Sequence, residues 1–187
     1  MTPEQALKRL KEGNARFVAG TPQQTKVTPE LREDLFKNGQ HPYAAIVACS
    51  DSRTPVELIF DAGPGELFVV RTAGNIVGPS QMGSLEFAVT QLKVSLVVVL
   101  GHDKCGAVVA ATTDGAFSPS LQAIVDEIRD CAAGVVGDDP EAVVEKNVRH
   151  AVSKIAANPD ISKIVSEGAV QLAGSKYSLE SGLVTFF

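Results

Sequence analysis

The sequence of 187 residues lacks several features that would point to particular classes of protein. It has no tryptophan, only three cysteines, and 17 basic against 22 acidic side chains, for a net charge of −5. An odd number of cysteines without a secretion signal argues against a disulfide framework and leaves reduced thiols for metal binding or catalysis. Because no excess or stripe of basic residues is present, the sequence also argues against a nucleic-acid backbone or an acidic membrane surface as partner.

Long apolar runs are also missing. No segment approaches the roughly 18 apolar residues needed to cross a bilayer, and the amino terminus is charged from position 4 onward. We therefore expect a cytoplasmic protein. With 44% hydrophobic and 21% charged residues, the chain suits one domain over residues 1–187. Within it we expect an N-terminal helical arm over 1–38, a core that carries the functional site over 40–115, and helices with C-terminal strands over 116–187.

Two segments share a pattern in which a short apolar, mostly β-branched run ends in groups that bind metals. Residues 44–55 read AAIVACSDSRTP, and residues 95–107 read SLVVVLGHDKCGA. Each run predicts a buried strand. The metal-binding groups at the carboxyl ends of these strands are Cys49 and Asp51 in the first segment and His102 and Cys105 in the second.

Helical patterns alternate with the expected strands. Leu85, Ala88 and Val89 begin an i, i+3, i+4 repeat between strands expected at 67–71 and 96–100, and a further strand is expected at 169–172. This alternation predicts an α/β fold with a mainly parallel central sheet, of strand order near 2-1-3-4 plus a C-terminal strand, flanked by helices. In that order the ends of the first and third strands meet at a switch point, where ligands collect.

An N-terminal helix is predicted by Thr2, Pro3 and Gln5, which combine an N-cap, a proline at the first helical position and a capping-box residue. Its apolar stripe is narrow because charged residues occupy most of its circumference. We therefore expect this helix to project from the core and to pack on a second subunit.

Two thiolates and an imidazole form a donor set that suits Zn²⁺, and three protein ligands leave the fourth tetrahedral position for water, as in catalytic sites. Asp51 and Arg53 are close enough in sequence to form a charge-assisted pair. Asp51 could accept a hydrogen bond from zinc-bound hydroxide while Arg53 keeps it ionised, or could occupy the fourth position and close the site.

The motifs CSDSR, FVVRTAGN, SLEFAV and GHDKCGA, in this order, resemble β-class carbonic anhydrases, and the likeness runs from about Gln40 to Val109. The resemblance implies reversible hydration of carbon dioxide to bicarbonate and a proton by zinc-bound hydroxide. It also implies a homo-oligomer, either a homodimer or a dimer of dimers. The implied site has one Zn²⁺ per chain on Cys49, His102 and Cys105, with Asp51 and Arg53 as catalytic residues and Asp51 as a metal ligand in a closed form only.

Further positions are implied by the same resemblance. Gln40 matches a substrate-contacting glutamine that reaches across a dimer interface, and Phe68, Ala73 and Gly106 match small or apolar positions of the substrate pocket. Some members have an off state stabilised by bicarbonate bound near a tryptophan three residues before the first cysteine ligand and an arginine 22 residues after it. Here Arg71 is present but Ile46 replaces the tryptophan, so we expect no cooperative inhibition by bicarbonate.

Alternative functions share some of these residues. The same zinc site could hydrolyse CS₂ or COS, since relatives with the same ligands act on those molecules. From a different class, the zinc could be structural in a protein that is not an enzyme, or Cys49 could serve a thiol regulator. No CxxC pair is present, and the interval from Cys49 to Arg53 is too short for the loop of cysteine phosphatases. Cys131 is expected not to be a ligand.

Overall fold

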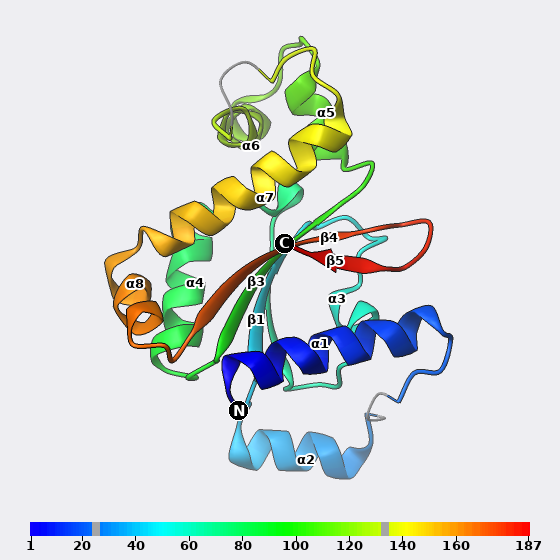
Figure 1. Ribbon diagram of the computed structural model, residues 1–187, viewed down its shortest axis with the longest axis vertical. Helices are drawn as coiled ribbons and strands as arrows, with labels where there is room; N and C mark the ends of the chain where they lie inside the picture. The colour runs from blue at the N-terminus through cyan, green and yellow to red at the C-terminus, as the bar shows by residue number, and fades with distance from the viewer. Residues whose placement is uncertain (24–26, 132–134) are drawn as a thin grey trace.

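The centre of the protein is a five-stranded sheet, seen in a computed structural model that describes residues 1–23, 27–131 and 135–187 (Figure 1). The strands lie in the order β2-β1-β3-β4-β5, which confirms the expected order. The first four pair in parallel, and β5 is antiparallel to β4. Their bounds are β1 Ala44–Ala48, β2 Leu67–Arg71, β3 Leu96–His102, β4 Gln171–Tyr177 and β5 Val184–Phe186.

Strands β1 and β3 form the middle of the sheet, and every one of their residues is buried. Both faces of these strands are covered, which explains why their sequences are continuous apolar runs. The last residue of β1, Ala48, pairs with Arg71 of β2 and with Leu100 of β3. The carboxyl ends of three neighbouring strands therefore stand at the same edge, which is where the candidate ligands follow.

Helices cover the sheet on both faces and at its carboxyl edge. One face carries α1 and α3, and the other carries α4, α7 and α8 (Figure 1). A third apolar cluster joins α5, α6 and the start of α7 beside Cys49 and Cys105. The bounds are α1 Pro3–Val18, α2 Pro29–Asn38, α3 Val56–Ile59, a 3-10 turn (η1) Ala73–Asn75, α4 Pro79–Thr90, α5 Gly106–Thr112, α6 Pro119–Arg129, α7 Pro140–Ala156 and α8 Pro159–Ser166.

The last long strand differs from its expected position. The apolar residues 169–172 predicted a short strand, but β4 begins at Gln171 and continues to Tyr177. Gly174, Ser175 and Lys176 break the apolar pattern. Gly174 is required by packing, because a Cβ there would lie 2.9 Å from the Phe187 ring and 3.0 Å from Val148. The expected segments 1–38 and 116–187 contain residues 24–26 and 132–134, which lie outside the described residues.

The N-terminal helix α1 begins with the expected capping box of Thr2 and Gln5. It lies across the sheet of its own chain, and its stripe is already used there, because Ala6 and Leu10 are fully buried in the cluster with β1 and α3. The expected contact between α1 and a second subunit stays a prediction. Helix α2 has no buried residue, and its Phe36 is 89% exposed.

Asn14 connects α1 to two other parts of the fold. Its Nδ2 donates to the carbonyl oxygens of Ile59 at 3.2 Å and Gly182 at 2.8 Å, and its Oδ1 accepts from the backbone N–H of Val184 at 2.8 Å. The side chain is 3% exposed, so water cannot replace these partners. One residue thus fixes α1 to α3 and to the start of β5.

The Asn14→Ala variant should lose about 2 to 3 kcal/mol of unfolding free energy, because a buried N–H and two carbonyls lose their partner. Urea denaturation measures this loss. Asn38→Ala is the matched control, since Asn38 bonds Asp34 on the exposed surface of α2, and it should change stability by no more than about 0.5 kcal/mol. Equal stabilities for the two variants would contradict this role of Asn14.

Candidate metal centre

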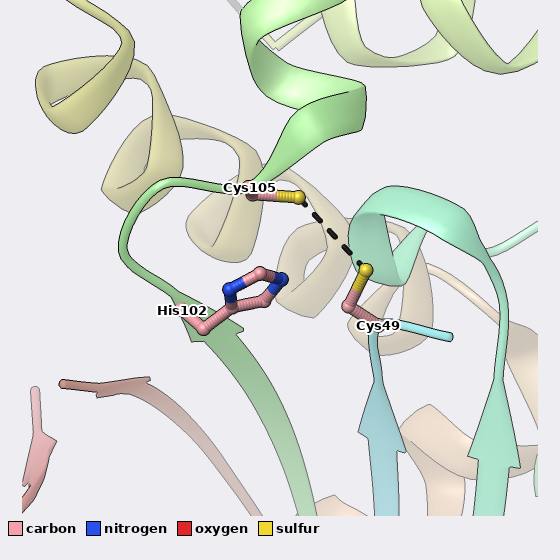
Figure 2. A group of neighbouring side chains, drawn as sticks. All are labelled: Cys49, His102 and Cys105. Carbon is pink, nitrogen blue, oxygen red and sulfur yellow. Dashed lines mark hydrogen bonds between the residues drawn. The ribbon is translucent and has the colours of Figure 1, made fainter. Parts of the chain in front are cut away.

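Three side chains with metal-binding atoms converge at the carboxyl edge of the sheet. Cys49 directly follows β1, His102 is the last residue of β3, and Cys105 is the N-cap of α5. Their ligand atoms all lie within 4.8 Å of one another, and Figure 2 shows the imidazole edge turned toward the two sulfur atoms. All three residues are at most 5% exposed. Within the described ranges, this is the one cluster of His, Cys, Asp and Glu side chains with that geometry.

The distances fit a tetrahedral metal. The Sγ atoms of Cys49 and Cys105 are 3.9 Å apart, too far for a disulfide. Two sulfur ligands, each about 2.3 Å from a tetrahedral zinc, would stand about 3.8 Å apart. The spacing of the two thiols therefore suits a shared zinc ion.

The imidazole of His102 is held in one tautomer. Its Nδ1 lies 2.8 Å from the carbonyl oxygen of Asp103, which can only accept, so Nδ1 carries the proton. Its Nε2 is buried and has no hydrogen-bond partner among the described residues. A buried nitrogen lone pair without a partner is costly, and a metal ion beside the two thiols would satisfy it.

The two thiols have opposite tendencies to ionise. Contact with the Cys105 thiol, with the His102 ring and with the backbone N–H groups of Asp51 and Gly74 lowers the pKa of Cys49 to about 4. For Cys105 the effect is reversed. Contact with Cys49, together with burial, raises the pKa of the Cys105 thiol, because two thiolates this close repel each other. A divalent cation removes that repulsion and allows both sulfurs to act as thiolates.

Asp51 and Arg53 form a pair at the rim of this cluster. The guanidinium donates from Nε to Oδ1 at 3.0 Å and from Nη2 to Oδ2 at 2.7 Å, and the Arg53 backbone N–H donates to Oδ1 at 2.8 Å. These bonds lower the pKa of Asp51 to about 2. Oδ2 of Asp51 lies 3.9 Å from Nε2 of His102. An ionised carboxylate thus stands next to the ligand atoms across the whole neutral pH range.

Arg71 fixes the loop that carries Cys49 and Asp51. Its Nε donates to the Cys49 carbonyl at 3.0 Å, and its Nη2 donates to the Asp51 carbonyl at 2.6 Å. Thr54 shares both acceptors through its hydroxyl and is 1% exposed. The sequence motif indicates Arg71 only as a regulatory position, and Thr54 has no sequence signal beyond its place in CSDSRTP.

A second loop contacts the Cys49 sulfur through Gly74. With φ at +69°, Gly74 directs its N–H to Cys49 Sγ at 3.3 Å. A Cβ there would lie 2.7 Å from the Ile128 side chain, so both conformation and packing require glycine. The Gly74 carbonyl accepts from Nδ2 of the buried Asn147 at 2.8 Å. Asn147 is a further supporting residue that the sequence did not reveal.

The expected pocket residues fall into two groups. Gly106 is adjacent to Cys105, and a Cβ on it would meet no atom within 4 Å, while Ala73 precedes Gly74 in η1. Phe68 pairs with Ala45 near the other end of the strands, and its ring packs 6.3 Å from that of Phe87. Gln40 is exposed before the amino end of β1. Within one chain, Gln40 and Phe68 are therefore not beside the ligand cluster. Cys131 lies outside that cluster.

The chain is similar to known carbonic anhydrases in sequence and in fold. A family model described as carbonic anhydrase matches residues 44–184. Carbonic anhydrase 2 of Mycobacterium tuberculosis is 40% identical over 188 residues, which cover 96% of this chain and 90% of that protein. A carbonic anhydrase of Mycolicibacterium smegmatis is 53% identical over 108 residues, covering 58% of this chain and 52% of that protein. The crystal structure of the β-carbonic anhydrase CafA of Aspergillus fumigatus has a TM-score of 0.76 at 28% identity, covering 98% of this chain and 89% of that one.

A mainly parallel sheet with a Cys-His-Cys cluster at the carboxyl edge of its parallel strands defines an α/β protein with a site capable of binding a metal. Together with the matches, it shows that the chain belongs to the β-class carbonic anhydrase family. The chain is thus an enzyme of the carbonic anhydrase type. No helix in the described ranges is both long and apolar enough to span a membrane.

Proposed function

We propose that the protein catalyses the reversible hydration of carbon dioxide to bicarbonate and a proton, with one Zn²⁺ per chain held by Cys49, His102 and Cys105. The observation that carries the proposal is the buried three-ligand cluster, with the ionised Asp51 carboxylate 3.9 Å from Nε2 of His102. Bound zinc supplies a hydroxide nucleophile near neutral pH by acidifying a water molecule, an effect established for carbonic anhydrases with three histidine ligands.

Zinc is the metal that this donor set supports best. Thiolates and imidazole suit a borderline-soft ion, and three protein ligands leave one tetrahedral position open to solvent or substrate. A closed structural site normally has four protein ligands. Within the described residues the cluster offers three, and the nearby Asp51 is engaged by Arg53 through both carboxylate oxygens. This supports a catalytic rather than a structural role for the metal.

Asp51 and Arg53 are proposed to orient the nucleophile. Oδ1 of Asp51 already accepts two hydrogen bonds from Arg53, whereas Oδ2 accepts one and keeps capacity for a second. With a pKa of about 2, Asp51 is an acceptor and not a donor at neutral pH. Only if the bonds to Arg53 broke could Asp51 become a fourth metal ligand, which is the proposed closed form.

The ligand variants Cys49→Ala, His102→Ala and Cys105→Ala should each lose bound zinc and hydration activity, because two ligands cannot hold the ion against dilution and washing. Cys131→Ser is the matched control and should retain about one zinc per chain and full activity. Metal analysis by mass spectrometry and stopped-flow CO₂ hydration measure both properties. Full zinc occupancy in any ligand variant would show that the metal site is assigned wrongly.

The variants Asp51→Ala and Arg53→Ala should keep zinc but hydrate CO₂ about 100-fold more slowly or worse, because they remove an oriented acceptor rather than a ligand. Arg149→Ala is the control, since this exposed arginine pairs with Glu145 one turn away. If the zinc-loaded Arg53→Ala variant were as fast as the control, the pair would be structural only.

If the zinc-loaded wild type hydrolysed CS₂ or COS without hydrating CO₂, the substrate would be reassigned.

We infer that the chain acts as a homo-oligomer, either a dimer or a dimer of dimers. A Sordaria macrospora structure of 26% identity and TM-score 0.76 is described as a tetrameric β-carbonic anhydrase. Gln40 cannot line the site of its own chain, so its pocket role requires a second subunit. Phe36 on α2 is 89% exposed, which supports α2 as part of the contact surface.

The three free cysteines also fit a cytoplasmic location for the protein.

The intact chain should have the mass of two or four protomers in light scattering. In that assembly Gln40→Ala should lower kcat/KM by about 10-fold and leave zinc content unchanged, because losing one substrate contact costs about 1.4 kcal/mol. Asn38→Ala provides a control on the preceding helix. A fully active monomer would contradict both the assembly and the role of Gln40.

We propose that bicarbonate does not inhibit the protein cooperatively. Arg71 is engaged with the Cys49 and Asp51 carbonyls, and Ile46 is fully buried within β1 and offers no hydrogen-bond donor. A bicarbonate ion there would lose hydration without sufficient partners. The initial hydration rate should therefore fall hyperbolically as bicarbonate is added at fixed pH. A sigmoidal fall would reveal a regulatory site.

A further inference from the structure

The peptide between Asp103 and Lys104 connects a metal ligand to a carboxylate on another element. Its carbonyl oxygen accepts from Nδ1 of His102 at 2.8 Å, and its N–H donates to Oε1 of Glu141 at 2.7 Å. The opposite side of the imidazole presents Nε2, the ligand atom, to the two thiols. A continuous series of hydrogen bonds therefore runs from the Glu141 carboxylate, through one peptide, to His102.

The backbone of this connection is held in an unusual conformation. Lys104 has φ at +51°, in the left-handed region that non-glycine residues rarely adopt. Such a conformation persists when its surroundings fix it. Three hydrogen bonds do so here. The Lys104 N–H donates to Glu141, and the Lys104 carbonyl accepts from Arg53 Nη2 at 3.2 Å. The Asp103 N–H donates to the Tyr177 carbonyl at 3.2 Å.

Glu141 lies in the first turn of α7 and has a second partner on the sheet. Its Oε2 accepts from Nζ of Lys176, on β4, at 2.7 Å. Burial alone would raise the pKa of Glu141, but the Lys104 N–H and Lys176 together hold that pKa below its ordinary value. The carboxylate that faces the peptide is therefore ionised at neutral pH, and Lys176 partly balances its charge.

The other charged groups nearby face a surface pocket of about 370 Å³ that Glu141 shares with Asp103, Glu145 and Lys176. Asp103 is engaged by the Leu179 N–H at 2.9 Å, and Glu145 pairs with Arg149. The side chains of Glu141 and Lys176 are 40% and 32% exposed. Solvent therefore screens Glu141, and its influence on His102 must travel mainly through the hydrogen-bonded peptide.

We propose that Glu141 is a positioning residue for the metal centre, acting on His102 through the Asp103–Lys104 peptide. The inference deepens the proposed function, since it rests on His102 being a metal ligand. An anion on the N–H side of a peptide polarises it and strengthens its carbonyl as an acceptor. A stronger acceptor on Nδ1–H fixes the ring and makes Nε2 a better electron donor to the metal, as a direct carboxylate does in carboxylate–histidine–zinc triads.

Two substitutions change the charge in opposite directions and keep the fold. Glu141→Gln retains an oxygen that accepts from the Lys104 N–H but removes the negative charge. Lys176→Met leaves Glu141 charged and removes its counter-ion. Glu145→Gln, one turn along α7, is the matched control because the Glu145 carboxylate lines the same pocket but pairs with Arg149 and not with the Lys104 N–H. Glu141→Ala, which also removes the hydrogen bond to the turn, serves as the more severe variant.

Zinc release to a chelator and the proton NMR resonance of the His102 Nδ1–H in the zinc-loaded protein provide readouts independent of activity. We expect Glu141→Gln to release zinc about 3- to 10-fold faster, which is below the about 10- to 100-fold effect of removing a direct partner of a metal ligand, because Glu141 acts through a peptide. The Nδ1–H resonance should move upfield, because its hydrogen bond is weaker. The midpoint of the pH profile of kcat should fall, because a metal that receives less charge from His102 is a stronger Lewis acid. Lys176→Met should shift all three quantities the opposite way.

The inference is overturned if Glu141→Gln and Lys176→Met match Glu145→Gln in zinc release and in the Nδ1–H resonance. It is also overturned if both shift these quantities in the same direction, as general loosening of the loop would. In either case a wild type that holds zinc and hydrates CO₂ leaves the proposed function intact. A wild type that binds no zinc overturns the proposed function and this inference with it.

Discussion

The site depends on two thiols held 3.9 Å apart in a buried position beside an imidazole. Without a cation, the ionisation of Cys49 suppresses that of Cys105, and Nε2 of His102 is left with no partner in the described structure. A divalent metal resolves both conflicts at once. The fold thus maintains an arrangement that is unfavourable by itself and becomes favourable when a metal binds, so metal binding should be linked to stability.

The sheet provides the precision that this arrangement needs. Because β1 and β3 are paired in register and buried throughout, Cys49 and His102 have little freedom to separate. The loops that follow them have no regular structure of their own, and side chains hold them instead. Arg71 and Thr54 hold the first loop, while Arg53, Glu141 and Asn147 hold the loops around it. Helix α7 supplies the last two of these residues, so it acts as a support for the metal centre as well as a cover for the sheet.

The sequence was sufficient to predict what is local in the chain. Continuous apolar runs ending in CSDSR and HDKC predicted the central strands, the strand order and the residues that meet at their ends. It was not sufficient for β4, whose Gly-Ser-Lys segment has no apolar pattern, or for α8, a short helix of eight residues. Nor did it reveal Glu141 and Asn147. Their partners are 37 and 73 residues away, and a single acidic or amide residue on an amphipathic helix resembles an ordinary solvated side chain.

X-ray absorption spectroscopy of the zinc-loaded protein is the most direct test of the central claim that three ligands hold an open zinc site. We expect two sulfur neighbours at about 2.3 Å, one imidazole nitrogen at about 2.0 to 2.1 Å, and one further light atom that a small anion can replace. A shell of four sulfur atoms, a shell without sulfur, or a fourth ligand that no added anion displaces would contradict it.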